Sequence, residues 1–236
     1  MIGQDDAQAR TVPVDLRLYG LLDMGVCGTD AERLAAMAAA AARGGCTLLQ
    51  YREKSISDAR AALARIRAIH DALRGSGVPL LVNDRVDLAL AAGVEGVHLG
   101  QSDLHPAEAR RLLGRTAIIG LTLKTGAQAD ELYRLPVDYG CIGGVFATTS
   151  KDNPDPPVGL DGLGRIVFRG RLARGAGFPL GAIAGIDSSN AAAVIGAGAD
   201  GIAVISALFG GEDTEARARD LRHRVDSALA ARGATR

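Results

Sequence analysis

The chain has 236 residues, of which 47% are hydrophobic and 23% are charged, and its 27 basic side chains balance 27 acidic ones. This composition is typical of a globular protein, and the length suits one α/β barrel domain. Because the net charge is zero, there is no basic surplus to attract nucleic acid or an acidic membrane surface. Charged ligands are therefore expected to bind at a local site.

Residues 1–14 contain acidic side chains and no apolar signal-peptide core, so a flexible extension is expected before a single domain over residues 15–236. No apolar stretch reaches the roughly 20 residues that a membrane span needs. Cys27, Cys46 and Cys141 lack disulfide or metal spacing and fit a reducing compartment. A cytoplasmic protein without nucleic-acid or membrane partners is expected; homo-oligomer formation stays open.

Short apolar runs alternate with helix-like segments along the chain. The runs that favour strands cover residues 16–22, 47–51, 78–82, 96–99, 117–121, 139–146, 180–183 and 201–205. The segments that favour helices cover residues 30–43, 57–74, 85–92, 106–113, 127–135, 159–169, 189–197 and 214–231. Eight such units predict an α/β fold, a closed (β/α)8 TIM barrel of parallel strands. A doubly wound open sheet is the alternative, but the glycine-rich fingerprint expected after its first strand is missing from the sequence.

Two local signals refine this pattern. Asp30, preceded by Thr29, and Ser57 are candidate helix N-caps. Residues 147–163 contain prolines and no periodicity, which predicts a long loop after the sixth strand.

Reacting groups of TIM barrels lie at the carboxyl ends of strands, so the residues after each apolar run are the candidates. After the second run comes QYREK, in which alternation places Gln50, Arg52 and Lys54 on the inward face and Tyr51 and Glu53 on the other. Two cations and an amide at a barrel mouth favour an anion site. The alternative is a solvated strand end with a surface ion pair.

The third and fourth runs are followed by carboxylates. Asn83 and Asp84 follow the third run, and Asp103 follows the fourth, five residues after His98. Two carboxylates on neighbouring strands suit Mg²⁺, which shares its coordination shell with substrate phosphates. Asp84 could instead cap the following helix, and His98 could be a packed core histidine.

The last four strands favour phosphate binding. Hydroxyl and lysine side chains follow the fifth and sixth runs, and small residues follow the seventh and eighth; they are Thr122, Lys124, Thr148, Thr149, Ser150, Lys151, Gly185, Ile205 and Ser206. Backbone N–H groups of small residues that each open a helix form a phosphate site in many barrels. The sequence therefore predicts one anion site suited to a diphosphate and another suited to a monophosphate.

From about Leu18 to the last helix, these motifs together resemble the thiamine phosphate synthase family. QYREK, VNDRVDLAL, HLGQSD, TTSK, AGI and GIAVIS match in order and spacing. The resemblance implies condensation of 4-amino-2-methyl-5-(diphosphooxymethyl)pyrimidine with a thiazole phosphate, carboxylated or plain, to give thiamine phosphate and diphosphate.

The resemblance also implies residue roles. The pyrimidine diphosphate would be bound by Gln50, Tyr51, Arg52, Glu53, Lys54, Asn83, Thr122 and Lys151, and Mg²⁺ by Asp84 and Asp103. The thiazole phosphate would be bound by Thr148, Thr149, Ser150, Gly185, Ile205 and Ser206. Arg52, Lys54, Thr122 and Lys151 are the expected catalytic residues.

The sequence departs from the family pattern at a few positions. Tyr51 replaces a frequent aliphatic residue, Thr122 a serine, Ser150 a threonine, and Ala184 the first glycine of a Gly-Gly pair, which puts the geometry of the phosphate loop in question.

Three rival functions fit parts of the same pattern. A thiazole tautomerase is the nearest, but it typically lacks the second metal carboxylate and carries a histidine where Lys124 stands. A phosphosugar or indole-type isomerase would explain the phosphate site after the last two strands, but not two carboxylates facing Arg52 and Lys54. A non-catalytic phosphate-binding barrel would be expected to lack a metal ligand or a cation, and the sequence retains both.

Overall fold

Eight short apolar strands pair in parallel in chain order within the described residues 14–148 and 156–234, and β1 closes the barrel against β8. The strands of this computed structural model are β1 (Leu18–Asp23), β2 (Leu48–Arg52), β3 (Leu80–Asn83), β4 (Gly96–Leu99), β5 (Ile118–Leu123), β6 (Tyr139–Ile142), β7 (Leu180–Ile183) and β8 (Gly201–Val204). The predicted TIM barrel is thus confirmed.

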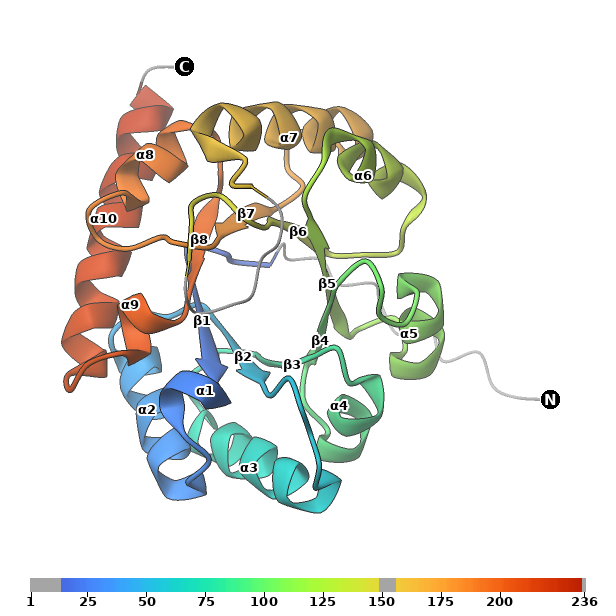
Figure 1. Ribbon diagram of the computed structural model, residues 1–236, viewed down its shortest axis with the longest axis vertical. Coiled ribbons are helices and arrows are strands. Elements are labelled where there is room, and N and C mark those ends of the chain that lie inside the picture. Colours follow the sequence, from blue (N-terminus) through green and yellow to red (C-terminus); the bar gives the residue numbers. More distant parts are fainter. Residues whose placement is uncertain (1–13, 149–155, 235–236) are drawn as a thin grey trace.

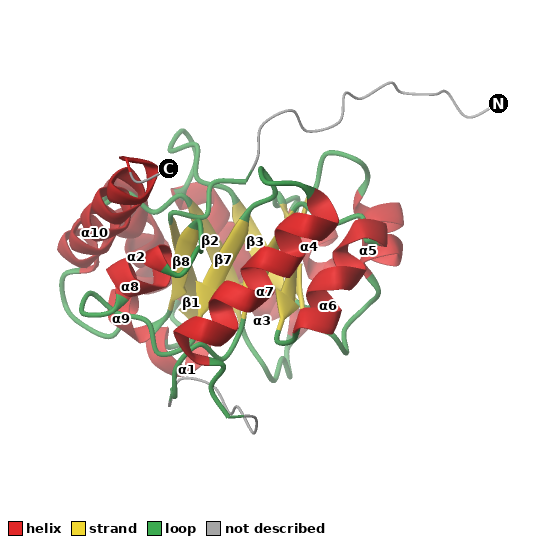
Figure 2. Cartoon of the chain, turned by 90° about the horizontal axis from the view of Figure 1, so that it is seen from above, coloured by secondary structure: helices red, strands yellow, loops and turns green. Residues whose placement is uncertain are grey.

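Helices surround the barrel on all sides (Figure 1). They are α1 (Met24–Cys27), α2 (Ala31–Arg43), α3 (Ala59–Ala72), α4 (Val86–Ala92), α5 (Pro106–Leu113), α6 (Gly126–Asp130) with the 3-10 turn η1 (Glu131–Arg134), α7 (Gly159–Arg174), α8 (Ala191–Gly196), α9 (Ser206–Phe209) and α10 (Thr214–Ala234). Figure 2 shows the strands at the centre of this shell, with α1 marking the end where the strands terminate. None of the helices in the described ranges is long and apolar enough to cross a membrane.

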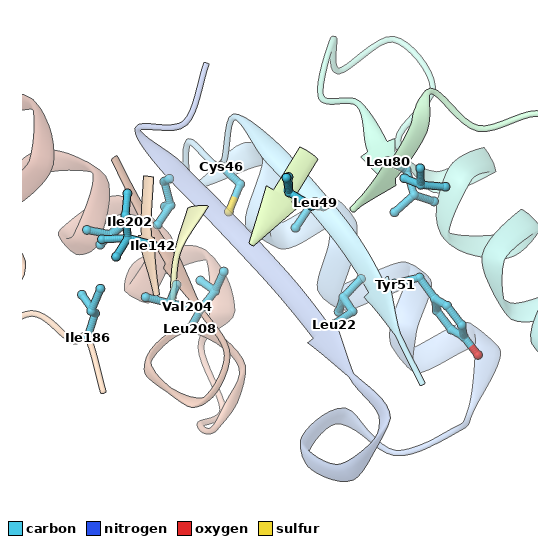
Figure 3. Packing of buried hydrophobic residues seen from close by; sticks show 14 of the residues in the cluster. Leu22, Cys46, Leu49, Tyr51, Leu80, Ile142, Ile186, Ile202, Val204 and Leu208 are labelled. Atoms are coloured by element: carbon cyan, nitrogen blue, oxygen red, sulfur yellow. The ribbon is translucent and has the colours of Figure 1, made fainter. Parts of the chain in front are cut away.

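Alternation along the strands builds two apolar layers. Tyr19, Leu48 and Tyr139 belong to the cluster inside the barrel. Leu49 and Tyr51 belong to the cluster between strands and helices, part of which Figure 3 shows. Because successive strand residues face opposite sides, Gln50 and Arg52 face the same side as Leu48. The strand pattern therefore decides which polar residues reach the barrel mouth.

Helix starts follow side-chain capping. Asp30 accepts from the Arg33 N–H at 2.7 Å and caps α2, as expected. The predicted cap Ser57 is wrong, because Asp58 caps α3 by accepting from the N–H groups of Arg60 and Ala61. The Asp58 carboxylate thus binds two donors that the first helical turn leaves without partners.

Several element boundaries differ from the sequence expectation. β6 ends at Ile142, before a pair of glycines, instead of at the expected residue 146. α7 begins at Gly159, as the expected helix 159–169 does, so the connection from β6 to α7 starts and ends earlier in the chain than the expected loop 147–163. The expected helix 127–135 divides into α6 and η1, and the two four-residue helices α1 and α9 were not predicted.

The expected N-terminal extension over residues 1–14 stays a prediction. Residues 1–13 lie outside the described residues. Val14, which the sequence analysis assigned to the extension, is 8% exposed and packs in the inner apolar cluster.

Candidate active site

Arg52 lies at the carboxyl end of β2 and faces the barrel mouth in a buried ion pair with Asp23. The two side chains are 8% and 9% exposed, and Arg52 Nη1 donates to Asp23 Oδ2. The other oxygen of Asp23 accepts from the Gly25 N–H at 2.9 Å and caps α1. Asp23, at the end of β1, is a site residue that the sequence analysis missed. Its only signal in the sequence is a carboxylate at the end of an apolar run.

Tyr51 and Glu53 lie on the opposite face, as the alternation predicted. The Tyr51 hydroxyl donates to Glu53, and Arg65 of α3 donates to the Tyr51 hydroxyl at 3.0 Å and to Glu53 at 2.7 Å. Desolvation by burial raises the pKa of Tyr51 above its ordinary range. This cluster attaches β2 to α3. The positions of these two side chains therefore do not support their expected contact with substrate.

The Asp84 and Asp103 carboxylates are brought together beyond β3 and β4. Burial raises the pKa of Asp84, and the nearby Asp103 carboxylate raises it further, while Lys54 lowers it. Lys54 Nζ lies 3.4 Å from Asp84 Oδ2, and its side chain is 56% exposed. Asp103 also accepts from the Gly100 N–H at 2.6 Å. The two carboxylates therefore lie close enough to interact, and the metal site that the sequence assigns to them stays a prediction.

The backbone of Asp84 argues against the helix-cap alternative. Arg85 occupies the N-cap position of α4 without any side-chain cap hydrogen bond. Asp84 has φ of 62°, a left-handed conformation that is uncommon for residues other than glycine. Such strain occurs often at functional sites, where the surrounding structure holds it in place.

Gln50, Asn83, His98 and Thr122 line a pocket inside the mouth. Gln50 and Asn83 are buried, and Gln50 Oε1 and Asn83 Nδ2 have no hydrogen-bond partner within the described part of the chain. Because a buried polar atom without a partner costs free energy, an acceptor and a donor at a pocket wall suit a polar ligand. His98 bonds Thr122 and Tyr139, each at 2.8 Å, so it is a hydrogen-bonded residue of the pocket rather than a packed core histidine.

The opposite side of the mouth consists of small residues after β7 and β8. Thr148, Gly185, Ile205 and Ser206 line one pocket there. Gly185 has φ of 64°, and a Cβ on it would lie 2.5 Å from the Ala147 carbonyl oxygen. Ala184, where the family often has glycine, has φ of 93°. The loop therefore keeps a glycine-like path at Ala184 despite its side chain.

Helix starts at this end only partly match the expectation. Ser206 opens α9 directly after β8. After β7, however, α8 begins only at Ala191. The residues between form a turn, in which Asp187 accepts from the Ser189 N–H and Asn190 donates to the Gly185 carbonyl. The expected residues Thr149, Ser150 and Lys151 lie outside the described residues. Lys124 lines the pocket beside Thr122.

The donor set at Asp84 and Asp103 fits Mg²⁺. Two carboxylates in contact supply oxygen ligands, and no cluster of three or more His, Cys, Asp or Glu side chains occurs over residues 14–148 and 156–234. Mg²⁺ usually takes one or two protein carboxylates and completes its shell with water and substrate phosphates.

The closed barrel, with its charged groups gathered where the strands end, defines a TIM-barrel enzyme. The chain belongs to the thiamine monophosphate synthase family, whose model matches residues 18–208.

Individual relatives agree with the family assignment. The chain is 50% identical over 220 residues to a thiamine-phosphate synthase of Agrobacterium fabrum, a match that covers 93% of this chain and 98% of the relative. It is 44% identical over 209 residues to a thiamine-phosphate synthase of Chloroflexus aurantiacus, which covers 89% and 92% of the two chains. The solved structure of a thiamine phosphate pyrophosphorylase from Pyrococcus furiosus superposes with a TM-score of 0.78 at 31% identity, covering 92% of this chain and 98% of that one.

Proposed function

We propose that this protein condenses 4-amino-2-methyl-5-(diphosphooxymethyl)pyrimidine with a thiazole phosphate, giving thiamine phosphate and diphosphate. The observation that carries this proposal is the interaction between the Asp84 and Asp103 carboxyls at a mouth that also holds Arg52 and Lys54. Family membership supports the same reaction.

The pyrimidine diphosphate fits the side of the mouth formed by β2 to β5. The unpartnered Gln50 Oε1 and Asn83 Nδ2 offer an acceptor and a donor to a heterocycle that carries both functions. Arg52 and Lys54 supply positive charge for the diphosphate. Lys54 is largely exposed, and its ion pair with Asp84 is long, at 3.4 Å. Because such an exposed pair contributes little free energy, the ammonium group can turn toward a phosphate at little cost.

We also propose that Asp84 and Asp103 hold the expected Mg²⁺ together with the diphosphate. When bound, Mg²⁺ would neutralise negative charge that develops on the departing diphosphate. Its charge would also relieve the repulsion that raises the pKa of Asp84.

The thiazole phosphate fits the small-residue side of the mouth. Gly185, Ile205 and Ser206 line the pocket where a phosphate can approach backbone N–H groups, with the Thr148 hydroxyl beside them. Thr149, Ser150 and Lys151 follow directly in the sequence and are proposed to complete this site and to contact the diphosphate.

The reaction asks little acid–base chemistry of the protein. The carbon–oxygen bond of the diphosphate ester breaks with its electron pair leaving on the diphosphate, and the thiazole nitrogen lone pair forms the new carbon–nitrogen bond. No proton has to move. The barrel therefore contributes mainly by stabilising charge on the leaving group and by holding the thiazole nitrogen against the carbon that loses the diphosphate.

The cellular setting is proposed from the cysteines. Cys27, Cys46 and Cys141 are all buried, and none of them forms a disulfide, which supports a reducing compartment such as the cytoplasm. Whether the protein forms homo-oligomers would be determined by measuring its mass in solution.

The direct test incubates the purified protein with both substrates and Mg²⁺ and quantifies thiamine phosphate and diphosphate. The proposal predicts that the two products appear in equal amounts, and that omitting either substrate abolishes both. Isomerisation of the thiazole phosphate without coupling would contradict the proposal and favour a tautomerase.

A further inference from the structure

A chain of hydrogen bonds crosses the inside of the barrel and joins two pocket-lining side chains, Gln50 and Thr122. Gln50 Nε2 donates to the Tyr19 hydroxyl, and the Tyr139 hydroxyl donates to the same oxygen at 3.0 Å. The Tyr139 hydroxyl lies 2.8 Å from His98 Nδ1, and His98 Nε2 lies 2.8 Å from the Thr122 hydroxyl. These five side chains come from β2, β1, β6, β4 and β5.

The middle of this chain is closed to solvent. Tyr139 is 0% exposed, Tyr19 2% and His98 8%. Burial raises the pKa of both tyrosines, so both hydroxyls keep their protons. The rings of Tyr19 and Tyr139 meet edge to face at 6.0 Å, which fixes their relative orientation.

The Tyr139 ring packs directly against the backbone of the neighbouring strand β5. Gly120 of β5 pairs with Tyr139, and a Cβ on Gly120 would lie 2.1 Å from the Tyr139 ring. The ring occupies the space that the missing Gly120 side chain leaves, and its hydroxyl is hydrogen-bonded to His98 and Tyr19 there.

The order of donors and acceptors follows from the hydrogen bond that Tyr139 donates to Tyr19. Because Tyr139 gives its proton to Tyr19, His98 Nδ1 must donate to the Tyr139 oxygen. A neutral imidazole that donates from one nitrogen accepts at the other, so Nε2 accepts from the Thr122 hydroxyl. Thr122 then presents oxygen lone pairs to the pocket. Gln50, whose amide nitrogen is held by Tyr19, presents Oε1.

We propose that Tyr19, Tyr139 and His98 are positioning residues that hold Gln50 and Thr122 as acceptors facing the pocket. The pocket would thereby select a heterocycle with an amino group over one with an oxo group at the same position. An oxo group would bring a third acceptor to these two oxygens and leave them without donors. This inference rests on the proposed function, because it identifies the heterocycle as the aminopyrimidine.

The test measures equilibrium binding, by calorimetry, of two non-reactive probes: 4-amino-5-hydroxymethyl-2-methylpyrimidine and its 4-oxo analogue. The wild type is expected to prefer the amino probe by at least about tenfold, as one mismatched buried hydrogen bond implies. Tyr19→Phe frees the Gln50 amide to turn over and is expected to reduce this preference about tenfold. Tyr139→Phe, which breaks the chain at its centre, is expected to do the same.

Two controls separate positioning from a loss of fold. Tyr133→Phe removes a tyrosine hydroxyl from a side chain that is 66% exposed, on η1, and is expected to leave the preference unchanged. Inorganic phosphate binding on the β7–β8 side should also be unchanged in the Tyr19 and Tyr139 variants, because that site is formed by other strands.

The outcomes distinguish this inference from the proposed function. An unchanged amino-to-oxo ratio in both folded variants would overturn the positioning role, as would a wild type that binds both probes equally. If the wild type binds the amino probe selectively but makes no thiamine phosphate in the coupled assay, the proposed reaction is overturned instead. Binding needs no turnover, so the ratio is decisive in either case.

Discussion

At the scale of single residues, the charged groups of the mouth do not all contribute in the same way. Arg52 is buried and already paired with Asp23, whereas Lys54 is mostly exposed and only loosely paired with Asp84. A buried guanidinium held by a carboxylate is a fixed part of the site, and an exposed ammonium can follow the ligand. Asp84 and Asp103 place two negative charges together, which costs stability until a cation arrives.

Breaking the buried Asp23–Arg52 ion pair is expected to lower the free energy of unfolding. Asp23→Asn keeps an oxygen that can accept from the Gly25 N–H, but it leaves the buried Arg52 without its counter-ion. The free energy of unfolding, measured with urea, should fall by about 3 kcal/mol. Asp87→Asn, which removes an exposed carboxylate paired with Arg85, should change it by less than about 0.5 kcal/mol. Equal effects in the two variants would contradict the buried pair.

The raised pKa of Asp84 predicts a stabilising variant. Its carboxyl ionises less readily in the folded protein than in the unfolded chain, so ionisation opposes folding as pH rises above the ordinary value of 3.8. Asp84→Asn removes that penalty, and asparagine tolerates the left-handed backbone. Without Mg²⁺ at neutral pH, Tm should rise by about 2 °C once solvent screening is allowed for.

The same variant has a pH signature. At about pH 3, where Asp84 is protonated in both states, the advantage of Asp84→Asn over wild type should vanish. Mg²⁺ should raise the Tm of the wild type and not that of the variant. An advantage that persists unchanged at acidic pH would show that charge repulsion is not its cause.

At the scale of elements, the loops after the strands decide what each side of the mouth can bind. Polar and charged side chains lie at or directly after the ends of β2 to β5, whereas β7 is followed by Ala184 and Gly185, both with positive φ, and β8 by Ile205 and Ser206. Ala184 keeps a φ of 93° without being glycine, so the loop holds a conformation that its sequence does not favour. At the neighbouring Gly185, the backbone of this loop lies close to the Ala147 carbonyl oxygen.

Gly185→Ala should therefore impair the thiazole phosphate side selectively. The added Cβ would lie 2.5 Å from the Ala147 carbonyl oxygen, and the alanine would have to adopt a φ of 64°. The KM for thiazole phosphate in steady-state assays should rise at least about tenfold, while the KM for the pyrimidine diphosphate stays within about twofold. A parallel rise in both KM values would indicate a general loss of structure rather than a damaged phosphate loop.

At the scale of the whole molecule, the barrel depends on close backbone approach where its last and first strands meet. A Cβ on Gly201, the first residue of β8, would lie 1.6 Å from the Leu16 carbonyl oxygen, just before β1. This contact lies at the amino end of the strands, away from the mouth. A substitution at Gly201 should therefore change stability rather than substrate binding, as is usual for that face of a TIM barrel.

Gly201→Ala is expected to destabilise the fold by at least about 2 kcal/mol, because backbone and not a flexible side chain would have to move. Gly177→Ala, at a position where a Cβ would meet nothing within 4 Å, is the matched control and should be nearly neutral. Denaturant unfolding of both variants checks this. A neutral Gly201→Ala would contradict the tight closure of β1 on β8.

Much of this architecture could be predicted from sequence because continuous apolar runs and alternation report burial directly. They located the strands and the inward face of Gln50 and Arg52. Asp23 could not be found that way, because a single carboxylate at the end of a strand forms no recognisable sequence motif. Only the structure shows that it pairs with Arg52 of β2. The contacts among Tyr19, Tyr139 and His98 also escaped, because they join strands far apart in the chain. Tyr51 and Glu53 show the opposite error: they share a motif with the site residues but face α3.

The central claim is that the Asp84–Asp103 pair serves the coupling reaction, and turnover as a function of Mg²⁺ concentration tests it most directly. Wild type and Asp103→Ala would be assayed side by side for thiamine phosphate, with Asp87→Ala as the control for losing a nearby carboxylate. The account predicts Mg²⁺-dependent product from wild type and from the control, and a loss of at least about a hundredfold in Asp103→Ala. Equal turnover in Asp103→Ala, or wild-type product formed without any divalent cation, would contradict it.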